Sequence, residues 1–338
     1  MTTAPAASSP AGAPPLLAVE SVDVTLGRGW RANQVLSGVD LDIWPGEIVG
    51  LVGETGSGKT TLARTVVGLV NPTRGRVVLD GLPISALRGR PLRAKRRRGH
   101  VQLVFQDPLR SLDPDLTVAE IVAEGLRIRG EADRDEIRRR VTAALEQVGL
   151  DATVLERTPG QISGGQRQRV SIARALAVEP RLLICDEPVS ALDASSRNHV
   201  LSLLRELRDS LGLPIVIISH DLSSLAGIAD RVAVLYRGRI VEDGPADRVF
   251  ATPRHPYTAL LMASAPSVRH DRPFSPHQLR HTGPAPVAGP GACVFAARCR
   301  FAAGACAAQP PLIPVGEGWS AACHRHEEWD GLTQSAHP

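Results

Sequence analysis

The stretch Gly53-Glu54-Thr55-Gly56-Ser57-Gly58-Lys59-Thr60 decides the fold. It follows an apolar run over residues 48–52, which predicts a buried strand, and Thr61 continues into a segment with the pattern of a helix. Strand, glycine-rich loop, Lys-Thr and helix form the context of a phosphate-binding loop. We expect the backbone N–H groups of the loop to cradle the β-phosphate, with Lys59 reaching the β- and γ-phosphates and Thr60 binding Mg²⁺.

Composition predicts a soluble globular protein with more than one part. The chain has 338 residues, of which 43% are hydrophobic and 22% charged, enough for one large domain and a smaller one, or for two medium ones. No apolar run approaches the roughly 18–20 residues that a membrane-spanning helix needs. Residues 1–16 are rich in Ala, Pro and Ser and lack the basic start and apolar core of a signal peptide, so we expect a disordered leader. The protein is predicted to be cytosolic, and any membrane contact would come through a partner.

A basic run occupies residues 88–98, within a net charge of +4. Such a run binds nucleic acid or anionic lipid in some proteins, but it is more often a solvated segment between elements. No aromatic residue interleaves it, and aromatic residues make up only 3% of the chain, which argues against a base-stacking platform. We expect no nucleic-acid partner.

The phosphate loop is expected to lie in a large domain, residues 17–265. Near its start, residues 17–26 and 35–43 predict strands of an antiparallel β subdomain. Apolar positions at helical spacing then predict a helical subdomain over about residues 109–178. The continuous apolar runs 182–185 and 214–219 predict parallel strands that are buried on both faces.

Two carboxylates follow the first of these buried strands directly. Asp186 and Glu187 would lie at its carboxyl end, where open α/β sheets bind ligands. Asp186 is placed to hold Mg²⁺, and Glu187 to accept a proton from an attacking water molecule. Alone, the pair would also suit a surface turn; with a phosphate loop upstream, it indicates nucleotide hydrolysis.

Four further motifs appear in the same chain. They are the strand-end glutamine Gln106, the turn Ser163-Gly164-Gly165-Gln166, the turn Ser190-Ala191-Leu192-Asp193, and His220 after the second buried strand. In this order they resemble the Q-loop, signature, D-loop and switch histidine of the nucleotide-binding subunits of ABC transporters. The resemblance covers roughly residues 17–265. It implies a P-loop NTPase fold of the ABC type, with antiparallel β and helical subdomains.

The resemblance also implies roles for these residues. The catalytic set would be Lys59, Gln106, Glu187 and His220, with Glu187 as general base and His220 in contact with the γ-phosphate. Mg²⁺ would be held through Thr60, Gln106 and Asp186. Residues 53–61 would bind ATP. Alone, His220 would be a buried strand-end histidine, and Gln106 an ordinary polar residue.

One copy of the signature implies that the chain works as a dimer. Ser163 and the amides of Gly164 and Gly165 would open a helix, and a helix N-terminus favours anions. In proteins that resemble this one, the signature contacts the ATP bound to the opposite subunit. Two ATP molecules are thereby held between two such domains, whose opening and closing drive a membrane partner.

The adenine site departs from the family pattern. Members of the family stack the base on an aromatic residue upstream of the loop, and the aligned position here is Leu26. Either Trp30 takes this role and joins the ATP-binding set, or aliphatic packing replaces stacking. Because base–aromatic stacking contributes roughly 1–3 kcal/mol, its loss would weaken ATP binding.

Further details resemble the dipeptide, oligopeptide and nickel import branch. They are an extended Q-loop over residues 105–114, the segment His255-Pro256-Tyr257-Thr258, and a C-terminal part with four cysteines. The branch implies an ATPase subunit that powers uptake of peptides or a small solute such as nickel. The alternative is a non-transport ABC ATPase that acts on ribosomes or DNA, against which the single signature and the lack of inserted coiled coils argue.

The branch also implies partners and a location. We expect a second ABC ATPase subunit in a heterodimer, with a homodimer still open, and two transmembrane permease subunits. An extracytoplasmic solute-binding protein would act indirectly. The chain would then lie peripherally on the cytoplasmic face of the plasma membrane.

Residues 266–338 are predicted to be a linker followed by a small extension. Pro, Gly, His and Ala dominate its first part. The last part holds Cys293, Cys299, Cys306 and Cys323. Disulfides are improbable in a cytosolic protein, and four thiolates suit zinc or an iron–sulfur cluster. The branch is associated with a 4Fe–4S cluster; zinc and free thiols remain the alternatives.

Overall fold

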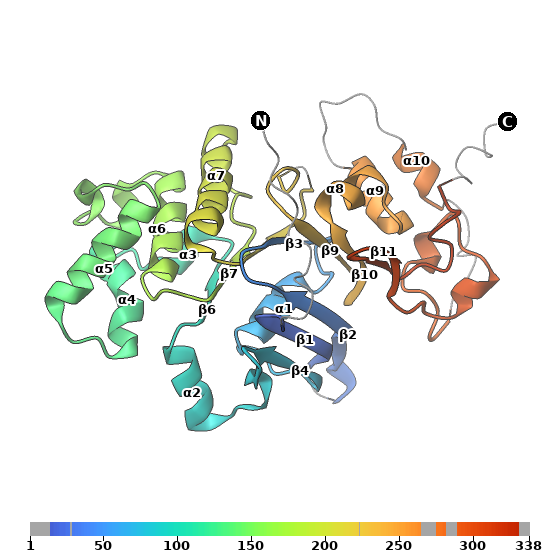
Figure 1. Ribbon diagram of the computed structural model, residues 1–338, viewed down its shortest axis with the longest axis horizontal. Helices are drawn as coiled ribbons and strands as arrows, with labels where there is room; N and C mark the ends of the chain where they lie inside the picture. Colours follow the sequence, from blue (N-terminus) through green and yellow to red (C-terminus); the bar gives the residue numbers. More distant parts are fainter. Residues whose placement is uncertain (1–13, 28, 223, 265–274, 282–288, 331–338) are drawn as a thin grey trace.

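Two β-sheets and a group of helices make up the structure, a computed structural model (Figure 1) that describes residues 14–27, 29–222, 224–264, 275–281 and 289–330. The larger sheet has eight strands. Their order is β11 (Ile313–Gly316), β12 (Trp319–Ala321), β10 (Arg239–Pro245), β9 (Arg231–Tyr236), β3 (Ile48–Val52), β8 (Ile215–Ser219), β7 (Leu182–Asp186) and β6 (Val101–Val104). The α/β fold of the P-loop type is therefore confirmed.

The parallel part of this sheet brings the predicted motifs to one edge. β3, β7 and β8 are buried along their whole length, as their continuous apolar sequences predict. β3 pairs in parallel with β8 so that Val52 faces Ser219, and β8 pairs in parallel with β7 so that Ile218 faces Asp186. The phosphate loop, Asp186 and His220 consequently leave the sheet side by side.

The smaller sheet is antiparallel, as predicted. Its order is β2 (Asn33–Ile43), β1 (Leu17–Leu26), β4 (Arg74–Leu79) and β5 (Leu82–Pro83). A tight turn at Asp80 and Gly81, both with positive φ, joins the last two strands. Helix α1 (Lys59–Val66) lies between the two sheets, and its apolar side completes their shared core.

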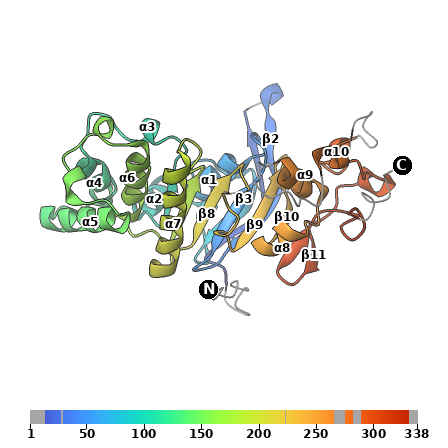
Figure 2. The same cartoon turned by 90° about the horizontal axis from the view of Figure 1, so that it is seen from above.

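The helical subdomain consists of α3 (Pro108–Ser111), α4 (Val118–Arg129), α5 (Arg134–Gln147) and α6 (Gly164–Leu176). Thr117 and Glu120 form a capping box at the start of α4, and Asp133 caps α5. Figures 1 and 2 place these helices at one end of the molecule, beside α7 (Ala194–Leu211). Among the described residues, no helix is both long enough and apolar enough to cross a membrane.

The basic run forms a helix, α2 (Gly89–Arg97), rather than an irregular segment. None of its residues is buried, so the prediction of a solvated stretch is confirmed. Its sequence lacks an apolar period because no face of the helix is buried against a core, and the periodicity that normally reveals a helix is therefore missing.

The C-terminal extension is not a separate module but continues the larger sheet. Along the chain, β10 is followed by the helices α8 (Ala246–Ala251), α9 (Pro256–Ser264) and α10 (Pro276–Leu279). The strands β11 and β12 come after these helices and pair at the edge of the sheet beside β10. The carboxylate of Glu242 on β10, fully buried, accepts hydrogen bonds from Arg254 N, His255 N and Trp319 Nε1. A buried carboxylate needs such partners, so it ties the extension to the domain.

Some predicted boundaries fall on residues that are not described. Residues 1–13 of the predicted leader and 265–274 of the predicted linker lie outside the described residues. At the other end of the leader, Leu16 is buried, and its carbonyl accepts a hydrogen bond from Asp80 N. The packed part of the chain thus includes Leu16, one residue before the predicted domain start.

Candidate active site

The phosphate loop connects β3 to α1, and its shape depends on Gly53 and Gly58. Gly53 has φ +157°, and a Cβ there would lie 2.2 Å from Leu235 O. Gly58 has φ +111° and precedes the first residue of α1; a Cβ there would lie 2.7 Å from Leu36 Cδ2. Glycine suits the positive φ at both positions, and at Gly53 the Leu235 carbonyl also excludes a Cβ, so the loop's shape follows from its sequence.

Lys59 lies inside the loop. Its side chain is buried, and its amine donates hydrogen bonds to the carbonyls of Gly53 at 2.6 Å and Glu54 at 2.9 Å. Burial lowers the pKa of Lys59, whereas the charges of Glu187 and Asp186 raise it. The amine therefore stands at the centre of the loop with two carboxylates near enough to act on it.

Asp186 ends β7 beside the loop. Asp186 is buried, and burial raises the pKa of its carboxylate, while a hydrogen bond from the Thr60 side chain lowers it. A carboxylate and a hydroxyl are thus adjacent at the position where the sequence predicts Mg²⁺. Oxygen ligands of this kind are those that Mg²⁺ prefers, so the donor set fits the ion.

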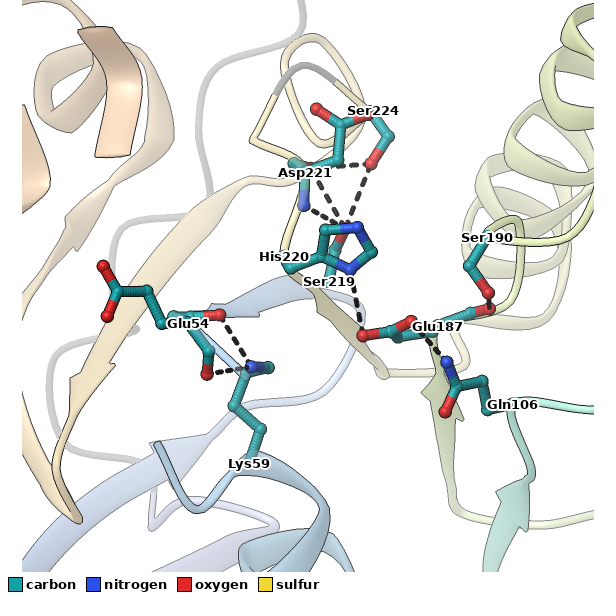
Figure 3. A network of polar contacts seen from close by, with 10 residues as sticks. Glu54, Lys59, Gln106, Glu187, Ser190, Ser219, His220, Asp221 and Ser224 are labelled. Carbon is teal, nitrogen blue, oxygen red and sulfur yellow. Dashed lines mark hydrogen bonds and ion pairs between the residues drawn. The ribbon is translucent and has the colours of Figure 1, made fainter. Parts of the chain in front are cut away.

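Glu187 holds two of the predicted residues together (Figure 3). Gln106 Nε2 donates a hydrogen bond of 2.6 Å to Glu187 Oε2, and His220 Nδ1 lies 3.0 Å from Glu187 Oε1. Glu187 has φ +48°, an uncommon backbone conformation for a residue other than glycine. Such strain persists only where the surroundings enforce it and clusters at functional sites.

The turn after β8 places His220. Ser219 Oγ accepts a hydrogen bond from Asp221 N, and Ser224 Oγ donates one to the carbonyl of Asp221 (Figure 3). The His220 side chain is 55% exposed, whereas that of Glu187 is 15% exposed. The imidazole therefore contacts Glu187 through Nδ1 while about half of its surface stays exposed, so that a terminal phosphate can approach it.

The signature turn opens α6, as its sequence predicts. Ser163 N and Gln166 Oε1 are 2.9 Å apart, and Gln166 N donates to Ser163 Oγ, which makes a capping box. Ser163 and Gly164 are exposed. Figures 1 and 2 show α6 beside α4 and α5 and away from α1, which follows the chain's own phosphate loop.

The D-loop leads into α7. Asp193 caps this helix by accepting hydrogen bonds from Ser195 N and Ser196 N, each of 3.0 Å. The bonds to Ser196, above all from its backbone, lower the pKa of Asp193 to about 2. Ser190 Oγ donates to the carbonyl of Glu187, so the D-loop begins in contact with the residue predicted to be the base.

The adenine-site residues are only partly described. Leu26 ends β1 with 41% of its surface exposed. Trp30 belongs to the short helix Gly29–Arg31, but its side chain lies outside the described residues. The choice between aromatic stacking by Trp30 and aliphatic packing by Leu26 therefore stays a prediction.

Two residues from the C-terminal part of the chain, Tyr257 and Arg298, contact the phosphate loop although nothing in the sequence pattern predicts it. Tyr257 Oη accepts a hydrogen bond of 2.9 Å from Glu54 N. The guanidinium of Arg298 makes two hydrogen bonds to the Glu54 carboxylate, of 2.8 and 2.9 Å. More than 200 residues separate each partner from Glu54, and no local pattern reports contacts of that range.

The four C-terminal cysteines line one small cavity, together with His255 and His324. Burial raises the pKa of Cys299 and that of Cys323 to about 12. Buried thiols without a cation are therefore protonated. Within the described part of the chain, no three His, Cys, Asp or Glu side chains form a group that could hold a metal ion.

Comparison with known proteins connects this geometry to a family. Residues 36–190 match the ABC transporter family, and residues 241–306 match the C-terminal region of oligopeptide/dipeptide transporters. A "putative peptide import ATP-binding protein" of Brucella ovis is 45% identical over 312 residues, covering 92% of this chain and 98% of that protein. The oligopeptide transport ATP-binding protein OppF of Escherichia coli is 42% identical, covering 88% of this chain and 91% of that protein.

Solved structures show the same fold. One is cbiO1 from Clostridium perfringens, part of the transporter complex cbiONQ, with a TM-score of 0.64, 32% identity, and coverage of 71% of this chain and 92% of that one. Another is the dimeric post-hydrolysis state of the ATP-binding cassette MJ0796 with ADP and Pi, with a TM-score of 0.62, 32% identity, and coverage of 68% and 98%. At such identity over nearly the full length of its relatives, the chain belongs to the ABC transporter family, as an ATP-hydrolysing subunit.

Proposed function

We propose that this chain hydrolyses ATP to power an importer of peptides or a related small solute such as nickel. The observation that carries hydrolysis is the Glu187 carboxylate, hydrogen-bonded to Gln106 and His220 at the sheet edge that holds the phosphate loop. The solute class is supported by the match of residues 241–306 and by the names of the peptide-importing relatives.

The loop binds the nucleotide by its phosphates. Backbone N–H groups of residues 53–60 and the start of α1 favour anions, and Lys59 exchanges its carbonyl partners for β- and γ-phosphate oxygens. Thr60, Asp186 and Gln106 would hold Mg²⁺, which supplies charge neutralisation of the phosphates. Thr61, the next residue in the first turn of α1, completes the set of residues proposed to bind ATP.

Glu187 then acts on water. Its carboxylate accepts a proton from the attacking water molecule and orients that molecule in line with the γ-phosphate. Gln106 and His220 hold the two carboxylate oxygens, which fixes the direction of the remaining lone pairs. His220, exposed on its outer side, contacts the γ-phosphate and reports its presence.

The exposed signature turn would complete the site of a second subunit. Ser163 and the first amides of α6 bind the γ-phosphate held by the partner, and the partner's signature covers this chain's ATP. The solved relative MJ0796 is a dimer in its post-hydrolysis state. We favour a heterodimer with a related ATPase, bound to two permease subunits at the cytoplasmic face of the membrane and served by an extracytoplasmic solute-binding protein.

Co-purification tests this function. The full chain, isolated with its membrane partners in detergent or nanodiscs, is expected to bring down two permease subunits and to hydrolyse ATP faster when its solute-binding protein presents a peptide. Dipeptides, oligopeptides and Ni²⁺ form the panel of solutes. Recovery of ribosomes without permease subunits, or ATP hydrolysis that no solute alters, would contradict the proposal.

We further propose that the cysteine cavity takes a 4Fe–4S cluster. Support comes from the four thiols that line one cavity. The four side chains must draw together to ligate it. The cluster would supply a fixed cross-link between Cys293 and Cys323 at the two ends of the extension.

Anaerobic purification tests the cluster. The protein is expected to be brown, with about four iron atoms per chain and broad absorption near 400 nm that Cys299→Ser abolishes. Cys185→Ser is the matched control, since that thiol is buried in β7 far from the cavity in sequence and in the sheet. A colourless protein without iron would remove the cluster, and zinc in its place would assign the cavity to that metal.

A further inference from the structure

Glu54 of the phosphate loop contacts two residues from the C-terminal part of the chain, Tyr257 of α9 and Arg298 of the extension. The Tyr257 hydroxyl accepts from its backbone N–H, and the Arg298 guanidinium pairs with its carboxylate through two hydrogen bonds. Figure 3 shows that the carboxylate points away from Lys59. Glu54 is therefore the position at which the C-terminal extension touches the nucleotide site.

Aromatic rings fix the position of Arg298. Its guanidinium carbon lies 5.7 Å from the ring centre of Tyr236 and 5.8 Å from that of Phe295, within range of cation–π attraction. Phe295 is buried and packs edge-on against Tyr236, with ring centres 5.3 Å apart. Tyr236 belongs to β9 and Phe295 to the extension, so the Arg298 guanidinium packs against one ring from each.

The charge of Glu54 is the reason this contact matters for ATP. An uncompensated carboxylate in a phosphate-binding loop repels a polyanionic ligand, and the repulsion reaches beyond direct contact. Glu54 acts electrostatically on Lys59, whose pKa it raises. Its hydrogen bonds with Arg298 lower the pKa of Glu54 itself, which keeps the carboxylate charged and therefore in need of a counter-charge.

We propose that Arg298 is a positioning residue for ATP binding: it neutralises and orients Glu54, so that the C-terminal extension forms part of the nucleotide site. This inference rests on the proposed function, because it assumes that residues 53–60 bind ATP. Arg298 is the residue before Cys299 in the sequence, and Cys299 lines the cysteine cavity.

Binding of a fluorescent ATP analogue and steady-state hydrolysis test the proposal in the full chain with its partners. Arg298→Gln is expected to raise Kd and KM for ATP roughly threefold to tenfold, a modest range because the ion pair is partly exposed to solvent. The kcat should stay within about twofold. Within the described part of the chain, the hydrogen bonds of the Arg298 side chain go to Glu54 and Tyr236 and not to the residues that act on water.

Rescue separates charge from structure. Adding Glu54→Gln to Arg298→Gln removes the unpaired carboxylate and should bring Kd back to within about twofold of wild type. Arg298→Lys, which keeps the charge, should lose less than Arg298→Gln. The difference between wild type and Arg298→Gln should also shrink at high salt, because exposed charges are screened. A purely structural role predicts no rescue and no salt effect.

Arg300→Gln is the matched control. It lies in the same extension with the same charge change, is exposed, and donates only a long bond to the Gln278 carbonyl among its described contacts; its Kd should match wild type. If wild type binds ATP and Arg298→Gln binds it equally, or if the double variant is not rescued, this inference is wrong while the proposed function stands. A wild-type chain that fails to bind ATP overturns both.

Discussion

Replacement of Glu187 by glutamine should lower steady-state ATP hydrolysis by at least ~100-fold, because the amide cannot accept the proton that a general base removes from water. ATP binding should stay within a few-fold of wild type. Glutamine keeps the size of the side chain and one oxygen atom. That oxygen can still accept the hydrogen bond that Gln106 Nε2 donates to Glu187 Oε2 at 2.6 Å in the wild-type protein. The variant would therefore bind ATP and stop before hydrolysis.

Phosphate release by the complete complex measures this loss, with nucleotide binding measured in parallel. Glu206→Gln is the matched control, since Glu206 is exposed on α7 and makes the same change of charge outside the site. Turnover above a tenth of the wild-type rate in Glu187→Gln would assign the base to another residue.

Replacement of Lys59 by alanine should weaken ATP binding on the order of 100-fold. Its amine makes two hydrogen bonds within the loop, to Gly53 O and Glu54 O, and a hydrogen bond to a charged group contributes ~1.5–3 kcal/mol. A 100-fold loss corresponds to ~2.7 kcal/mol, which lies within the contribution of one such bond to a phosphate oxygen. The alanine variant also leaves the two loop carbonyls without their buried donor, which loosens the loop.

The chain offers a close control for this variant, because its sequence contains only two lysines. Lys95 lies on the exposed helix α2 and carries the same charge outside the loop. Equilibrium binding of radiolabelled ATP should be weakened by this factor in Lys59→Ala and unchanged in Lys95→Ala. Equal affinity of Lys59→Ala and wild type would show that the phosphates bind elsewhere.

The phosphate loop could be predicted from sequence because its shape depends on neighbouring residues. Gly53 and Gly58 adopt positive φ, and a Cβ at Gly53 would collide with the Leu235 carbonyl; such requirements leave a visible glycine pattern. The buried strands were equally visible, since a parallel strand covered on both faces is apolar throughout. The residues at their ends followed from the parallel register.

Contacts between distant segments could not be predicted in this way. Arg298 and Glu54 meet across 244 positions of the chain, and neither residue departs from what a solvated surface allows. The pairing of β12 with β10 was hidden for a similar reason: Trp319–Ala321 is too short to show alternation. The helix α2 was hidden because no side of it is buried.

We propose that each nucleotide site is shared between two chains, and the mass of the Glu187→Gln protein tests this sharing most directly. Sedimentation is measured for the full chain, alone and mixed with the ATPase subunit that accompanies it. We predict a stable dimer with Mg²⁺ and ATP, separate subunits with ADP, and no dimer when Ser163→Arg is added although ATP remains bound. A protein that binds ATP without associating, or a dimer that Ser163→Arg leaves intact, would contradict the shared site.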